Sequence, residues 1–185
     1  MRVAPIGLVF PAERAFAVAA QAAALTHGHP AGYLSAGTLA ALIAELLGGA
    51  DLKSAANGAL TLLRAWRQHE GTEAALMAAL RLAPQPGDPA TVIERELGGG
   101  WVGEEALAIA LYSALRSPTD FRTAICMAVN HSGDSDSTGS ICGAIMGALL
   151  GADAIPTDWV EQVERRGEIE ALSHALATLK VSPKA

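Results

Sequence analysis

The chain has 185 residues, a formal net charge of −6 at pH 7 and 51% hydrophobic residues, enough for one ordinary core in a single domain over residues 1–185. This composition excludes a disordered chain, and the acidic balance without a basic stripe argues against general nucleic-acid binding. Aromatic residues make up only 4%, whereas Ala, Leu and Gly dominate, which favours tightly packed helices. We find no convincing alternating strand and no internal repeat, so the sequence predicts an all-α domain.

Local start and stop signals divide the chain into a succession of helices. In the first half, helices are predicted over residues 11–26, over residues 32–47 with an end at Gly48, from Asp51 through Trp66, and from Thr72 to just before Pro84. In the second half, they are predicted from Asp88 to Gly98, over residues 103–116, from Ser117 to an acidic loop after Asn130, over the glycine-rich stretch beyond that loop, and from Thr157 onward. The segment after Lys180 is expected to fray.

The cysteines and the N-terminus indicate a cytoplasmic protein. Cys126 and Cys142 lie in apolar helical stretches and form neither a CxxC pair nor a zinc-finger spacing, so we expect reduced, buried thiols. The opening stretch, MRVAPIGLVFPAERAF, has an apolar run that Pro5 and Pro11 interrupt. That run is too short for the core of a signal peptide.

Three short patterns say little by themselves. His27 and His29 lie where a helix is predicted to end, but a zinc site needs three or four ligands and no further Cys or His stands at a supporting spacing. On spacing alone, surface histidines are the favoured interpretation. Trp101, in GGGWVGEE, fits either plain core or stacking on a planar ligand. Arg2 lies at the extreme terminus, where an arginine is usually exposed and without a role.

The segment NHSGDSDSTGSICGAIMGALLG is the most informative part of the chain. Asp134, Asp136 and Ser137 offer hard oxygen ligands, which Mg²⁺, Mn²⁺ or Ca²⁺ prefers. One helix cap would not need two aspartates around a serine. An EF-hand loop fails because Ile145 stands where its bidentate Glu is required and Ile141 falls inside the loop. A membrane span fails because the uncharged run is well below the ~20 residues that a bilayer demands.

Glycine recurs every fourth residue behind this acidic loop, at Gly139, Gly143, Gly147 and Gly151. On a helix these positions form one slowly drifting stripe. Each interior glycine costs about 1 kcal/mol relative to alanine. We therefore expect another backbone to approach this stripe closely and to hold the acidic loop rigidly.

Together, the segments THGHP, GWVGEEALAIAL and NHSGDSDSTGSICGAIMGALLG resemble, in this order, the ADP-ribosylglycohydrolase family, which includes the dinitrogenase reductase-activating glycohydrolases. The resemblance implies a compact all-α fold with a pair of divalent metals, Mg²⁺ or Mn²⁺, at the bottom of a cleft for ADP-ribose. It implies metal-assisted cleavage of the glycosidic bond that links ADP-ribose to a protein side chain or a small molecule. Asp134, Asp136 and Ser137 match the family's C-terminal metal motif.

The same resemblance implies several ligand-binding positions. Gly133 and Ser135 belong to the metal-binding turn, and His27 matches a position that lines the ligand cleft. The opening MRVAPIG, which contains Arg2, is similar to the end of a loop that cradles the ligand near its phosphates. Trp101 lies in a segment that resembles one near the cleft.

One departure from the family pattern concerns the N-terminus. Family members are considerably longer and begin with an acidic stretch, a Gly-Asp-containing helix and a Thr-Asp-Asp motif that supplies the other metal ligands and the acid/base groups. None of these precedes Met1. We therefore expect the C-terminal portion of the family's domain, N-terminally truncated, with no confidently assigned catalytic residue and with an N-terminal segment or companion chain as a possible partner.

Two alternatives to a hydrolase stay open at this point. One is a catalytically inactive domain of the same descent that binds ADP-ribose or a partner protein. The other is a helical oligomerisation module in which the glycine stripe merely packs. The two aspartates and the hydroxyls in one loop weigh against the second alternative, since packing alone would not require them.

Overall fold

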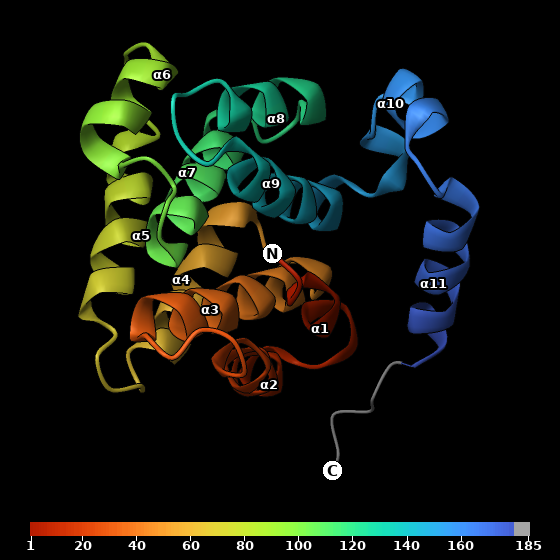
Figure 1. Ribbon diagram of the computed structural model, residues 1–185, viewed down its shortest axis with the longest axis horizontal. Coiled ribbons are helices and arrows are strands. Elements are labelled where there is room, and N and C mark those ends of the chain that lie inside the picture. The colour runs from red at the N-terminus through yellow and green to blue at the C-terminus, as the bar shows by residue number, and fades with distance from the viewer. Residues whose placement is uncertain (180–185) are drawn as a thin grey trace.

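The computed structural model describes residues 1–179, and over that range it contains helices and no strand (Figure 1). The α-helices are α1 (Ala4–Val9), α2 (Ala12–Ala24), α3 (Pro30–Leu47), α4 (Leu52–Leu63), α5 (Glu70–Leu82), α6 (Pro89–Val92), α7 (Gly103–Arg116), α8 (Phe121–Val129), α9 (Ser135–Leu150), α10 (Thr157–Gln162) and α11 (Arg166–Thr178). A short π-helix, Ile93–Leu97, continues α6, and a 3-10 turn, Ala152–Ala154, follows α9. The all-α prediction is confirmed, while the expected fraying after Lys180 lies outside the described residues.

Helices α3 and α7 form the centre of the hydrophobic core. α3 packs against α1, α2, α4, α7 and α9, and α7 also packs against α5, α8 and α9. Their backbones meet where glycine leaves room, since an ideal Cβ on Gly103 of α7 would lie 2.7 Å from the carbonyl oxygen of Ala31 in α3. Within residues 1–179, α3 is the one helix long and apolar enough to cross a membrane, and it is mostly buried, as a core helix is.

Local capping groups explain why most predicted helix ends agree with the structure to within a few residues. Asp51, for example, accepts the backbone N–H of Ser54 at 3.0 Å and caps α4, as predicted. One start is corrected: Asp120, rather than Ser117, caps α8 by accepting the N–H of Thr123 at 3.0 Å. The helix α1 was not predicted, because its six residues are too few to show a helical period.

The prediction of close backbone packing along the glycine stripe of α9 is largely wrong. An ideal Cβ on Gly139 would indeed lie 2.6 Å from Cγ1 of Val129 in α8. One on Gly143, however, would make an ordinary contact of 3.8 Å with Cδ1 of Ile125, and one on Gly147 would meet no atom within 4 Å. The close approach is therefore confined to the first turns of α9, next to the acidic loop.

The prediction of two buried thiols is half right. Cys142 lies in the core, and burial raises the pKa of its thiol to about 12. Cys126 lies on the exposed face of α8, where apolar neighbours in the sequence do not ensure burial. Both thiols are free of disulfide bonds.

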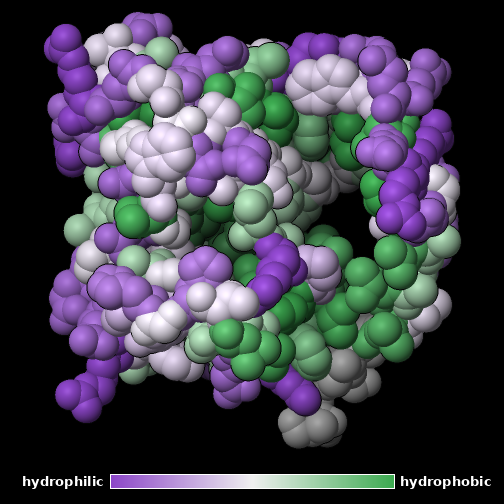
Figure 2. All heavy atoms as spheres, in the orientation of Figure 1, coloured by the Kyte–Doolittle hydropathy of each residue, from purple (hydrophilic) through white to green (hydrophobic). Residues whose placement is uncertain are grey.

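The helices α10 and α11 form an arm at one side of the molecule, and the arm contacts the rest through α8 and α1 (Figure 1). Arg122 of α8 holds α10, because its guanidinium lies 4.6 Å from the ring centroid of Trp159 and pairs with Asp158. α11 packs mainly on α1, and none of its residues is buried. Figure 2 shows an opening between this arm and the rest of the molecule.

Candidate functional site

A cleft of about 570 Å³ is lined by the first turns of α3 and α7, whose backbones meet at Ala31 and Gly103. One wall comes from residues 1–3, the end of α2 and the first turns of α3, and the other comes from residues 100–107 and the turn that leads into α9. Predicted site residues lie on both walls: Arg2, His27, Trp101, Asp134 and Ser137. The fold thus brings together candidates from three segments that are far apart in the sequence.

The first wall carries a fixed positive charge. Nη2 of Arg2 donates to the carbonyl oxygen of Ala22 at 2.9 Å and to Oγ1 of Thr26 at 2.8 Å, so the C-terminal end of α2 holds the guanidinium. Oγ1 of Thr26 also lies 2.8 Å from Nδ1 of His27. The imidazole has room because residue 32 is a glycine, whose ideal Cβ would lie 2.8 Å from Cβ of His27. A permanent cation beside an imidazole suits an anionic group such as a phosphate.

The opposite wall carries an ionised carboxylate. Asp134 caps α9 and accepts the backbone N–H of Ser137 at 3.4 Å. Side-chain hydrogen bonding with Asp136, and then with Ser137, lowers the pKa of the Asp134 carboxyl below its usual range. The N-terminus of α9 favours a negative charge at the same place. Asp134 is therefore a carboxylate at neutral pH, half-buried in the cleft wall.

Three other predicted residues belong to this turn but do not line the cleft. Asp136 is exposed on the first turn of α9, where its Oδ1 accepts the N–H of Ser137 at 3.0 Å. The hydroxyl of Ser135 donates to the carbonyl oxygen of Val129 at 2.9 Å, so it joins the turn to α8. Gly133 packs closely against the backbone of Gly99. The structure thus gives Gly133 and Ser135 roles within the turn, and their contact with a ligand stays a prediction.

The loop before α7 fixes the outer side of the turn. The carbonyl oxygen of Gly99 accepts the N–H of Asp134 at 2.8 Å, and an ideal Cβ on Gly133 would lie only 1.8 Å from that same oxygen. Trp101 follows in this loop with 72% of its surface exposed at the edge of the cleft. Such exposure excludes the interpretation of Trp101 as plain core and leaves its ring available to a planar ligand.

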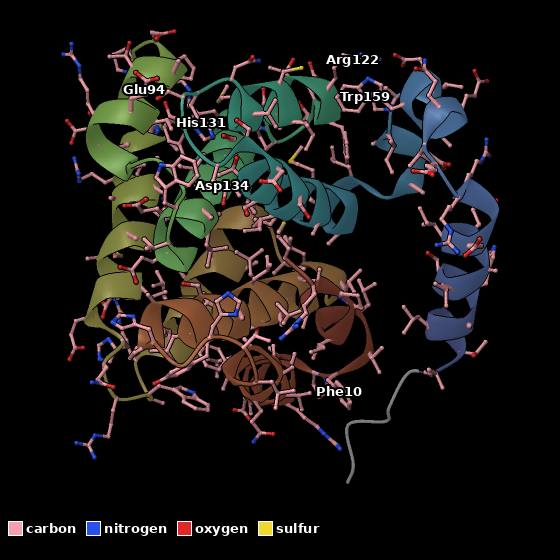
Figure 3. All side chains as sticks on the ribbon, in the orientation of Figure 1. Phe10, Glu94, Arg122, His131, Asp134 and Trp159 are labelled. Atoms are coloured by element: carbon pink, nitrogen blue, oxygen red, sulfur yellow. The ribbon has the colours of Figure 1, made fainter. Side chains whose placement is uncertain are left out.

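Two residues whose side chains link parts of the site by hydrogen bonds were not predicted. His131 accepts the N–H of Gly133 on Nδ1 at 3.0 Å, and its Nε2 lies 3.1 Å from Oγ1 of Thr138, a fully buried residue of α9. Figure 3 shows His131 and Asp134 close together at the start of α9. The sequence signal was the position of His131 between a predicted helix end and the acidic loop, but spacing alone does not reveal either bond. The same holds for Thr26, which links Arg2 to His27.

Comparison with known proteins decides the family. The sequence model described as ADP-ribosylglycohydrolase matches residues 1–185. The chain belongs to the ADP-ribosylglycohydrolase family. The ADP-ribosyl-[dinitrogen reductase] glycohydrolase of Rhodospirillum rubrum is 27% identical over 92% of this chain and 51% of its own length. An uncharacterized protein of Archaeoglobus fulgidus is 32% identical over 97% of this chain and 57% of its own length.

Another relative matches a shorter part of this chain. The human ADP-ribosylhydrolase ARH3 is 30% identical over 44% of this chain and 25% of its own length. The chain spans about half the length of the Rhodospirillum rubrum and Archaeoglobus fulgidus relatives.

The residues of the turn fit a divalent metal in part. Carboxylate and hydroxyl oxygens are the ligands that Mg²⁺ and Mn²⁺ prefer, and Asp134, Asp136 and Ser137 offer them within one turn. Within residues 1–179, however, no group of three or more His, Cys, Asp or Glu side chains is placed to hold an ion. Within residues 1–179, this turn would thus offer an ion two carboxylates and a hydroxyl, and the remaining coordination would have to come from water or from other groups.

Proposed function

We propose that this chain is the ADP-ribose-binding part of a divalent-metal-dependent ADP-ribosyl hydrolase. The observation that carries the proposal is one cleft that is lined by Arg2 and His27 and also by the ionised Asp134. This arrangement suits a ligand with an anionic pyrophosphate at one end and metal-coordinating ribose hydroxyls at the other. Relatives that are named as ADP-ribosyl hydrolases support the same assignment.

Five predicted residues around the cleft and one on the adjoining turn have a part in this proposal: Arg2, His27, Trp101, Asp134 and Ser137 at the cleft, and Asp136 on the turn. Arg2 and His27 bind the phosphates, and Trp101 stacks on a planar ring at the edge of the cleft. Asp134, Asp136 and Ser137 hold Mg²⁺ or Mn²⁺. The metal, when bound, orients the ribose hydroxyls and a water and stabilises the charge that develops as the glycosidic bond breaks. The substrate is an ADP-ribosylated protein or a small molecule that carries ADP-ribose.

The chain by itself should be a poor catalyst. Two carboxylates and a hydroxyl leave a divalent ion largely hydrated, so binding should be weak. Asp134 is the only carboxylate among the described residues that line the cleft, and in this proposal it binds the metal. A second carboxylate for proton transfer, the kind of group that the family resemblance implies, would then have to come from elsewhere, and one general acid or base is typically worth ~10²–10⁴ in rate. We therefore expect an N-terminal segment or companion chain to complete the active site.

A second candidate function is a non-catalytic domain that binds ADP-ribose. One observation favours it: the cationic wall is fully assembled by hydrogen bonds within this chain, whereas the metal ligands are only partly represented. In that case ADP-ribose should bind with similar affinity whether or not Mn²⁺ is present.

Calorimetric titration tests metal and ligand binding. Mn²⁺ should bind the chain weakly, and the double variant Asp134→Asn/Asp136→Asn should abolish that binding. Asp153→Asn is the matched control, because Asp153 is an exposed carboxylate in the turn after α9. Equal Mn²⁺ binding by the double variant would place the metal elsewhere and refute the site.

A release assay on an ADP-ribosylated protein tests catalysis. The chain alone should release ADP-ribose very slowly with Mg²⁺. The same chain joined to the N-terminal segment of a family member should be active, and that activity should require Asp134 and Asp136. Full activity of the chain alone would show that its own residues are sufficient and that the incomplete site is wrongly inferred.

A further inference from the structure

We infer that His131 is the positioning residue that sets the geometry of the metal-binding turn. The inference rests on the proposed function, in which Asp134, Asp136 and Ser137 hold a divalent cation. It concerns a side chain that is neither a metal ligand nor part of the cleft wall. Figure 3 shows His131 next to Asp134, where α8 gives way to α9.

The hydrogen bonds assign the protonation state of the imidazole. Nδ1 of His131 accepts the backbone N–H of Gly133 at 3.0 Å, so this nitrogen carries no proton. In the neutral ring the proton is then on Nε2, which donates to Oγ1 of Thr138 at 3.1 Å. The hydroxyl of Thr138 in turn donates a hydrogen bond to the carbonyl oxygen of Ala128 at 2.7 Å. Both ring nitrogens of His131 thus have hydrogen-bond partners, and neither is left to bind a metal.

These bonds join the two ends of the turn. Gly133 immediately precedes Asp134, and Thr138 immediately follows Ser137, so the imidazole spans the residues that carry all of the proposed ligands. Thr138 is fully buried and anchored to α8 through Ala128, which gives the imidazole a rigid support. On the other side, Gly99 accepts the N–H of Asp134. The direction of the Asp134 carboxylate is therefore fixed from both sides of the backbone.

Three variants of His131 separate the two bonds. Asn at this position places Oδ1 where Nδ1 stood, so it keeps the bond from Gly133 as an Asx turn and loses the bond to Thr138. Gln reaches toward Thr138 and loses the bond from Gly133, and Ala loses both. His174→Ala on the exposed helix α11 is the matched control for the loss of an imidazole.

Mn²⁺ affinity, measured by electron paramagnetic resonance, is the first readout. Substitution of groups that orient metal ligands typically weakens metal affinity by about 10- to 100-fold, and we expect that loss for His131→Ala and His131→Gln. His131→Asn should bind Mn²⁺ nearly as well as the unchanged chain, although its melting temperature should fall by a similar amount to that of His131→Gln. A purely structural role predicts instead that affinity follows melting temperature through the series.

Amide hydrogen exchange at Gly133 and Asp134, measured without metal, is the second readout. Exchange should be fast in His131→Ala and His131→Gln and slow in His131→Asn. Equal exchange rates in the Asn and Ala variants, or equal Mn²⁺ affinities, would overturn the inference. If the unchanged chain binds no Mn²⁺, the proposed metal site fails, but the exchange rates still decide whether His131 fixes the turn.

Discussion

Replacing Gly133 by alanine is the most direct perturbation of the candidate site. The ideal Cβ would lie 1.8 Å from the carbonyl oxygen of Gly99, whereas ordinary contacts begin at 3.4 Å, so the two segments must separate by about 1.6 Å. Both groups are backbone, and neither can swing aside as a side chain could. That movement breaks the 2.8 Å hydrogen bond from the N–H of Asp134 to Gly99. The turn and the loop that carries Trp101 should therefore come apart.

The expected cost can be estimated from two contributions. Overpacking typically costs about 1–3 kcal/mol, and the net loss of a hydrogen bond costs about 1 kcal/mol. We expect Gly133→Ala to lower the free energy of unfolding by about 2–4 kcal/mol, measured by urea denaturation followed by circular dichroism.

A control in α9 should change stability in the opposite direction. Gly147 lies inside the helix with no atom within 4 Å of an ideal Cβ, so Gly147→Ala should stabilise the protein by about 0.5–1 kcal/mol. If the free energy of unfolding of Gly133→Ala lies within about 0.5 kcal/mol of that of the unchanged chain, the close contact between residues 99 and 133 is refuted.

Three further predictions concern other parts of the chain. At pH 8, a thiol reagent should modify Cys126 at once and Cys142 only after unfolding, because Cys142 is buried and its thiol has a pKa of about 12. The pKa of Asp120 lies below its model-compound value of 3.8, chiefly because of the hydrogen bond from the Thr123 hydroxyl. The stabilisation from Asp120 should thus be present above pH 3.8 and disappear as the pH falls through the lower folded-state pKa, and acid titration of Asp120→Asn should lack that loss. Trp101→Ala should leave the free energy of unfolding within about 0.5 kcal/mol but weaken ADP-ribose binding by about 1–3 kcal/mol in calorimetry; unchanged binding would exclude stacking.

The sequence predicted the fold class well because the signals for helices are local. Asp51 and Asp88 cap their helices through residues two or three positions away, and such patterns can be recognised without knowing the tertiary structure. The glycine stripe of α9 was misjudged because what faces Gly143 and Gly147 depends on the packing of distant helices. The exposure of Cys126 was missed for the same reason.

The candidate site, too, could be predicted from the sequence only in part. The motifs correctly brought Arg2, His27 and Asp134 to one cleft, because the family resemblance carries information about tertiary structure that spacing lacks. The contact between Gly99 and the turn, and the bonds of His131, could not be predicted. The Gly99 contact joins two backbone segments, and the bonds of His131 depend on how the turn folds back onto α9, so the identities of the residues do not reveal either.

The two walls of the cleft come from segments that are far apart in the sequence, and this separation affects when the cleft can fold. Residues 1–39 form one wall and residues 100–141 the other, so the cleft forms only after contacts of long sequence separation are made. A partly folded chain has at most one wall and should bind the ligand poorly. Any ligand that touches both walls therefore stabilises the native state selectively, by about 2.7 kcal/mol at a concentration 100 times its Kd. Thermal shift with ADP-ribose would thus report whether the two walls of the cleft have come together.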